Sequence, residues 1–211
     1  SSPILCKPEY ESLSQNKLFF ALLSEKSHLN TPKLISYNLG NTFYHNDTIE
    51  QIYNKSELVS FFERVFTADN LEGLFFRPPT DYGGKGCFKL TKTGLKNELD
   101  DILDSLTNGY YVHNKLIEQH GEINKIHDKS VCTLRIISLI TSENHPEIIS
   151  IFMRFGVGNS VVDNASSGGF FVGVNIEEGT LDCTGHFLSE YGGAKIKKHP
   201  DSGFIFEGFK V

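Results

Sequence analysis

A glycine-rich segment carries the first side chains that are suited to chemistry. In FFRPPTDYGGKGCFKL (75–90), three glycines surround Lys85, and Arg77 precedes a proline pair. Glycine permits positive φ and lets the backbone N–H approach an anion, while Lys and Arg add positive charge. The segment matches neither the G-x-x-x-x-G-K-[ST] phosphate loop nor a G-x-G-x-x-G turn. Two compatible interpretations stay open, a plain β-hairpin turn and a flap that covers a triphosphate.

Two arginines in neighbouring apolar runs form the second group. Arg135 interrupts VCTLRIISLI and shares a strand face with Thr133, and Arg154 lies in FMRFG. If these runs pair through SENHPE, both guanidinium groups can lie on one face, which is costly unless an anion joins them. In the alternative interpretation, each arginine pairs with a nearby acidic residue or lies on a face exposed to solvent. A polar segment follows and favours the anion site; it comprises Asp163, Asn164, Ser166, Ser167, Gly168 and Gly169.

Three apolar patterns of helical period precede or separate these groups. They predict a helix over 14–27 with Ser14 as N-cap, one over 55–68 with Ser56 as N-cap, and one over 96–109 closed by Gly109.

Strands are predicted around the glycine segment and through the second half of the chain. The end of YYVHNKLIEQH (110–120) reads as a strand, and longer strands are expected over 131–141, 148–158 and 168–176. SENHPE has the length and residues of a hairpin turn. Helices mixed with short strands, followed by antiparallel sheet, predict an α+β protein with lobes over 1–115 and 116–211.

Composition excludes several classes of protein. The net charge of -6 over 211 residues argues against general nucleic-acid binding. No apolar run reaches the roughly 20 residues of a membrane span, and the four dispersed cysteines indicate free thiols. A cytoplasmic location is therefore the expectation. The eight histidines show no metal-ligand spacing, so His113, His120 and His127 are expected at the surface or at a hinge.

Six ordered pieces of the chain resemble the sugar-transfer-associated ATP-grasp family, which is related to α-L-glutamate ligases. The pieces are NKLFF, FFRPPTDYGGKG, KLIEQH, SVCTLRIISL, RFGVGNSVVDNASSGG and HPDSGFIFEGFKV. Together they cover nearly everything from about residue 16 to 211. The resemblance implies an ATP-grasp fold with two α+β lobes and the nucleotide between them.

The resemblance also implies a reaction and a set of site residues. ATP would convert a small-molecule or sugar-linked carboxylate into an acyl phosphate that an amine captures, with magnesium bridging the phosphates, in polysaccharide or surface-glycan biosynthesis. Phosphate would be held by Lys17, Arg77, Gly83, Gly84, Lys85 and Gly86, and adenine by Glu118, Gln119 and His120. The catalytic residues would be Arg135, Arg154 and Asn164, beside a substrate wall of Asp163, Ser166, Ser167, Gly168 and Gly169.

Three features differ from the family pattern. Arg77 stands where a lysine is usual, Cys132 replaces an asparagine, and the acidic residue and Glu-x-Asn that hold magnesium are expected beyond Val211. The C-terminal lobe is thus expected to be incomplete. An alternative function is a nucleotide-binding or structural domain without catalysis, and another is a β-rich module that binds anionic glycans.

Overall fold

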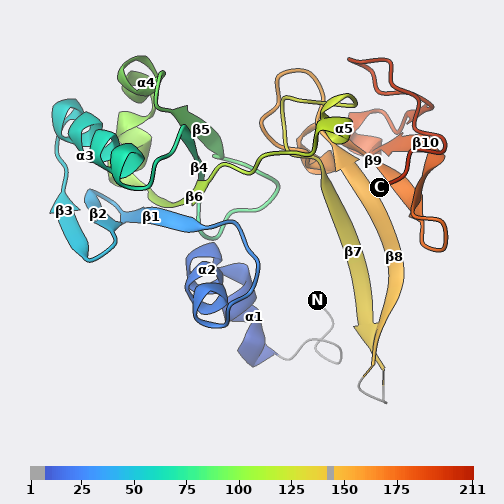
Figure 1. Cartoon of the computed structure of the whole chain (residues 1–211), viewed down its shortest axis with the longest axis horizontal. Helices are drawn as coiled ribbons and strands as arrows, with labels where there is room; N and C mark the ends of the chain where they lie inside the picture. Colours follow the sequence, from blue (N-terminus) through green and yellow to red (C-terminus); the bar gives the residue numbers. More distant parts are fainter. Residues whose placement is uncertain (1–7, 142–144) are drawn as a thin grey trace. The chain divides into compact units, whose positions relative to one another are not determined.

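The computed structural model describes residues 8–141 and 145–211 (Figure 1). The chain divides into two compact units, the first ending at Ile117 and the second running from Glu118 to Val211. Helices and antiparallel sheets occur together, which confirms the predicted α+β class. No helix within the described residues has the length and apolar character needed to cross a membrane.

The first unit is built on a six-stranded antiparallel sheet in the order β3-β2-β1-β6-β4-β5. Its elements are α1 (Pro8–Gln15), α2 (Lys17–Lys26), β1 (Leu34–Leu39), β2 (Thr42–His45), β3 (Thr48–Gln51), α3 (Lys55–Ala68), β4 (Gly73–Arg77), β5 (Phe88–Thr91), α4 (Leu95–Asn108) and β6 (Tyr110–Lys115).

Phenylalanine side chains fill the core between this sheet and the helices α3 and α4. Phe61 and Phe62 of α3 make edge contacts with Phe43 of β2, and Phe62 does so with Phe76 of β4. All four side chains are buried. The apolar periodicity of 55–68 therefore does form the core face of a helix, as predicted.

The second unit is a five-stranded antiparallel sheet in the order β11-β10-β9-β8-β7. Its elements are α5 (Gly121–Asn124), β7 (Thr133–Ile140), β8 (Pro146–Phe155), β9 (Phe170–Asn175), β10 (Thr180–Phe187) and β11 (Lys195–Ile196), with short 3₁₀ turns at Ala165–Ser167 and Ser189–Tyr191. Phe155, Phe170 and Phe206 lie at the centre of its core.

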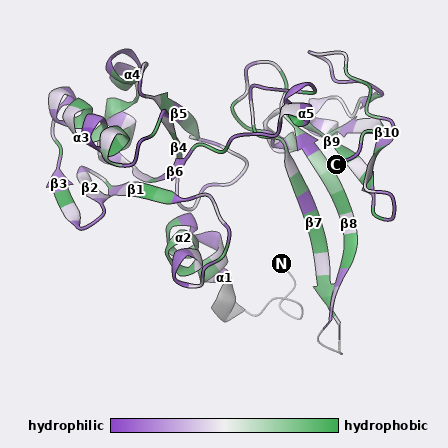
Figure 2. Cartoon of the chain, in the orientation of Figure 1, coloured by the Kyte–Doolittle hydropathy of each residue, from purple (hydrophilic) through white to green (hydrophobic). Residues whose placement is uncertain are grey.

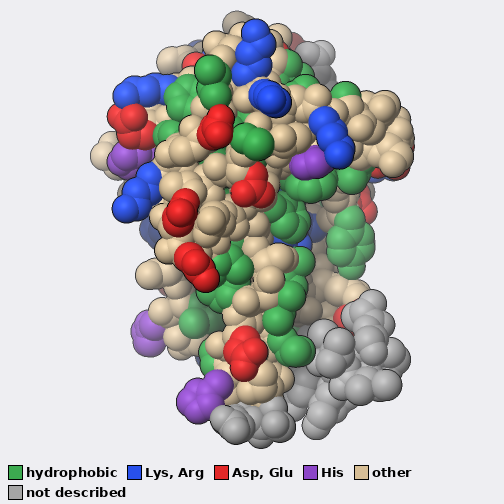
Figure 3. All heavy atoms as spheres, turned by 90° about the vertical axis from the view of Figure 1, so that its right-hand side faces the viewer, with side chains coloured by type: hydrophobic (Ala, Val, Ile, Leu, Met, Phe, Trp, Pro, Cys, Tyr) green, Lys and Arg blue, Asp and Glu red, His purple; other side chains and the backbone are tan. Residues whose placement is uncertain are grey.

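Strands β7 and β8 form the predicted hairpin and extend beyond the neighbouring strands (Figure 1). Apolar residues continue along its length (Figure 2), and many of their side chains are exposed. In Figure 3, hydrophobic side chains lie among Asp and Glu side chains on the visible surface. The exposed apolar residues of the hairpin are Leu134, Ile136, Ile137, Leu139, Ile140, Ile148 and Ile149.

Three local predictions are wrong. Asn16, rather than Ser14, caps α2, because its Oδ1 accepts hydrogen bonds from the N–H groups of the first turn. Asn54, rather than Ser56, caps α3 in the same way. The strand in 110–120 is β6 at the beginning of that range, not at its end. Gly109 does end α4, as predicted.

Candidate functional site

The glycine segment is a long turn between two paired strands. β4 and β5 are antiparallel neighbours, so the hairpin interpretation is confirmed. Gly83, Gly84 and Gly86 have φ values of 70°, 79° and 71°. This left-handed conformation is unfavourable for residues with a Cβ, which explains the glycines physically. Lys85 is exposed among them.

The first turn of α2 is fastened to this segment by Lys17. Its main-chain N–H donates to the carbonyl of Pro79 at 2.8 Å, and its Nζ donates to the carbonyl of Asp81 at 2.5 Å. Nζ also lies 5.9 Å from the centre of the Tyr82 ring, within cation–π range. The N-terminus of α2 and the turn after β4 therefore form one local structure.

Arg77, at the end of β4, adds a second cation to the same place. Its Nε and Nη2 donate to Oδ1 of Asn114 on β6, at 3.1 and 2.7 Å. Burial, and then the Arg77 guanidinium, lower the pKa of the Lys17 ammonium. Two partly buried cations thus repel each other, and an anion placed between them would relieve that repulsion.

In the second unit, Arg154 is held by a network of three side chains. Nε and Nη2 donate to Thr133 Oγ1 at 3.1 and 2.7 Å, and Nη1 donates to Asn164 Oδ1 at 2.7 Å. Nη2 also forms an ion pair of 3.2 Å with Asp163. Asp163 is buried and accepts hydrogen bonds from the N–H and the hydroxyl of Thr133. This carboxylate therefore orients Arg154.

Arg135 lies on the same sheet face as Arg154, as expected. In the register of β7 and β8, Thr133 is opposite Arg154 and Arg135 is opposite Phe152. Burial lowers the pKa of Arg154, Asp163 raises it, and the positive charge of Arg135 lowers it further. The proximity that the anion-site hypothesis requires is present, with Arg135 exposed and Arg154 half-buried.

The segment after β8 turns tightly around Asn164. The N–H groups of Ser167 and Gly169 donate to the carbonyl of Asn164, at 2.9 and 3.1 Å. A Cβ on Gly169 would lie 2.6 Å from the carbonyl oxygen of Phe155, so only glycine fits there. Gly168 has a φ of 88°, and the carbonyl of Ser166 accepts a hydrogen bond from the Tyr191 hydroxyl.

The residues predicted to hold adenine begin the second unit. The Gln119 side chain donates to the carbonyl of His127 and to Asn124, and it accepts from the N–H of Cys132. Because these hydrogen bonds occupy the Gln119 side chain, it stabilises the fold, and Gln119 would contact adenine through its main-chain groups. His120 caps α5, while Glu118 is exposed. Their roles toward adenine stay predictions.

Comparison with protein families decides the membership of the chain. The model of the sugar-transfer associated ATP-grasp family matches residues 6–211. The chain belongs to this family. A comparison with curated proteins found no match. Membership in an ATP-grasp family implies ATP binding and a ligase-like, ATP-dependent function associated with sugar transfer.

The geometry of the glycine turn fits the phosphates of an ATP-grasp nucleotide. Left-handed glycines and two cations suit polyphosphate. Magnesium prefers oxygen ligands. Among the described residues, one group offers three or more His, Cys, Asp or Glu ligands, and two of its three members are histidines. This group therefore does not suit magnesium, and the magnesium ligands stay a prediction.

The expectation of a surface or hinge position is wrong for His113, which is buried within β6. His127 is buried rather than at the surface. His113 lies in the core of the first unit, and His127 joins His199 and Asp201 in the second. The His-x-Asp spacing within HPDSG was the available signal, but His127 is distant in sequence and only the fold brings it near.

Proposed function

We propose that the chain is an ATP-dependent ligase that joins a carboxylate to an amine during the assembly of a polysaccharide or surface glycan. The observation that carries this proposal is the gathering of Lys17 and Arg77 at the glycine turn of the first unit. ATP supplies the phosphoryl group that activates the carboxylate.

The proposed role of the first unit is to hold the triphosphate. Lys17 would exchange its hydrogen bond with the Asp81 carbonyl for a phosphate oxygen, and Arg77 would remain anchored on Asn114 while its charge neutralises phosphate. The N–H groups of the glycine turn would provide uncharged donors.

The proposed role of the second unit is to bind the carboxylate and its phosphorylated form. Arg135 and Arg154 would neutralise this anion, and Asn164 and Asp163 would keep Arg154 in a fixed orientation. A preorganised guanidinium stabilises developing charge without reorganising during the reaction. Asp163 would then act through Arg154 rather than by touching substrate.

One experiment tests the proposal as a reaction. The purified chain is incubated with ATP, magnesium and a panel of sugar-linked carboxylates and amines, and ADP release is measured. ADP that depends on both substrates supports a ligase. ATP-dependent thermal stabilisation without ADP release from any pair contradicts catalysis by this chain.

That second outcome is the signature of the alternative function, a nucleotide-binding domain without catalysis. One observation favours it, because Arg77 stands where a lysine is usual in the family pattern.

A further inference from the structure

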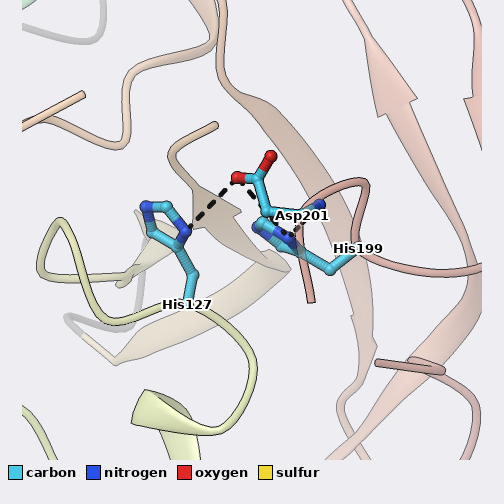
Figure 4. Close-up of side chains that lie close together, drawn as sticks. All are labelled: His127, His199 and Asp201. Carbon is cyan, nitrogen blue, oxygen red and sulfur yellow. Dashed lines mark hydrogen bonds and ion pairs between the residues drawn. The ribbon is translucent and has the colours of Figure 1, made fainter. Parts of the chain in front are cut away.

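A compact cluster of two histidines and one aspartate lies in the second unit. His127 follows α5, and His199 and Asp201 belong to the segment after β11 (Figure 4). Nδ1 of His127 lies 3.8 Å from Oδ2 of Asp201, and Nδ1 of His199 lies 4.0 Å from it. All three ligand atoms lie within 4.8 Å of one another.

We propose that His127, His199 and Asp201 form a binding site for a divalent transition metal of the zinc type. Two imidazole nitrogens and one carboxylate oxygen match the ligands that zinc uses, with bonds of about 2.0–2.2 Å. Magnesium and calcium are disfavoured because they prefer oxygen ligands. The cation is therefore a different one from the magnesium expected in ATP-grasp chemistry.

The hydrogen bonds of His199 hold its ring in the tautomer that metal binding needs. Nε2 lies 3.1 Å from the carbonyl oxygen of Gly156, which can only accept, so Nε2 carries the proton. Nδ1 keeps its lone pair and accepts the N–H of Asp201 at 3.2 Å. A backbone carbonyl behind a histidine ligand is the usual outer support of a metal site. Metal binding would replace the contact with the Asp201 N–H.

The other two ligands, His127 and Asp201, are held in place by neighbouring groups, and the Asp201 side chain can still move. The His127 ring stacks on His199 with centroids 4.9 Å apart, so the two imidazoles stay together. Oδ2 of Asp201 accepts a 2.7 Å hydrogen bond from the N–H of Gly158. The Asp201 side chain is 42% exposed, which leaves it free to move the remaining distance toward a shared ion.

The cluster opens on a pocket of roughly 440 Å³. His127 and Asp201 line it together with Asn124, Asp128 and Asn159. Zinc sites with three protein ligands keep a fourth position for water or another oxygen ligand. The pocket supplies space for that position.

The test is a titration of the full, metal-stripped chain with zinc chloride in a calorimeter, and with cobalt chloride by visible absorption. We expect one zinc ion per chain with micromolar or tighter affinity, and a cobalt spectrum of the intensity that four-coordinate sites give. Asp201→Asn should weaken zinc binding at least tenfold. Asp182→Asn, an exposed aspartate on β10, should leave it unchanged.

A second variant keeps the test decisive if Asp201→Asn retains some affinity. His127→Asn removes an imidazole, and its folding is checked by melting of the metal-free chain. Zinc affinity that is equal in the parent chain, Asp201→Asn and folded His127→Asn would overturn the proposal, because the ion would then sit on other histidines. Absence of stoichiometric zinc binding in the parent chain would overturn it as well.

Discussion

Lys17 at the start of α2 is joined to Asp81 in the turn between β4 and β5: the ammonium of Lys17 donates a 2.5 Å hydrogen bond to the main-chain carbonyl of Asp81. The main-chain N–H of Lys17 also donates a hydrogen bond to the carbonyl of Pro79. The conformation of the glycine turn and the position of the cation are thus linked, and a ligand that draws Lys17 away from Asp81 acts on the turn as well.

Gly86→Ala tests whether the conformation of the turn matters for nucleotide. Its φ of 71° and the 3.0 Å approach of a Cβ to Pro78 predict a loss of about 1–2 kcal/mol in the free energy of unfolding. We also expect weaker ATP binding, measured by calorimetry. Gly179→Ala is the matched control, since Gly179 has a φ of 67° with open space around it and lies in the other unit. Equal ATP affinity in both variants would remove the turn from nucleotide binding.

Thr133→Val tests the positioning of Arg154. It removes the hydroxyl that accepts from Arg154 and donates to Asp163, so the guanidinium loses one of its anchors. We expect the unfolding free energy to fall by about 1–3 kcal/mol. In the ADP-release assay, kcat should drop at least tenfold while KM for ATP stays nearly constant.

Thr133→Ser keeps the hydroxyl and is the control for that variant. It should restore most of kcat. If Thr133→Ser and Thr133→Val lose kcat equally, the hydroxyl network does not position Arg154 and the strand packing alone explains the loss.

His113 predicts a pH dependence of stability in the first unit. Ser36 Oγ lies 2.8 Å from its Nδ1, and its Nε2 lies 3.0 Å from Asn38 Oδ1. Asn38 Nδ2 donates to main-chain carbonyls, so Oδ1 is an acceptor, Nε2 carries the proton, and Ser36 donates to Nδ1. Burial lowers the pKa of His113 from 6.5 to about 3.

Between pH 6.5 and pH 3, His113 is therefore protonated in the unfolded chain and neutral in the folded chain. The free energy of unfolding should fall as pH decreases from 6.5 toward 3, by at most about 1.4 kcal/mol per pH unit from this group. NMR of the His113 ring should show no titration between pH 7 and pH 4. A midpoint near 6.5 in the folded protein would refute the assignment.

Arg77→Lys tests the departure from the usual lysine at this position. Lysine keeps the positive charge but cannot make the two-pronged contact with Asn114 Oδ1. We expect Arg77→Lys to bind ATP with an affinity within about fivefold of that of the parent chain. The reason is that the positive charge, rather than the two-donor geometry of the guanidinium, attracts the phosphates. A loss as large as that of Arg77→Gln, measured in the same calorimeter, would show that the fork geometry is essential.

The sequence predicted those features that depend on local pattern. The spacing of Leu58, Phe61, Phe62 and Val65 located α3, and these side chains are all buried. The choice of N-cap was less well determined, because serine and asparagine are both good caps and only the final backbone decides which side chain reaches the first turn.

Features made by tertiary contact were beyond such reasoning. Period two placed Thr133 and Arg135 on one face, but the ion pair of Arg154 with Asp163 requires the tight turn around Asn164. Nothing in the spacing of His127 and His199 indicates that their rings stack at 4.9 Å. Such clusters form when separate segments fold over the same core.

The most direct test of the central claim is calorimetric titration of the chain with ATP, repeated with Lys17→Gln, Arg77→Gln and Lys96→Gln. Lys96 is an exposed lysine on α4 and serves as the control for lost charge. We predict that the parent chain and Lys96→Gln bind ATP alike. Lys17→Gln and Arg77→Gln should each bind at least tenfold more weakly, a difference of about 1.4 kcal/mol. Equal affinity in all four proteins, or no binding at millimolar ATP, would contradict the account.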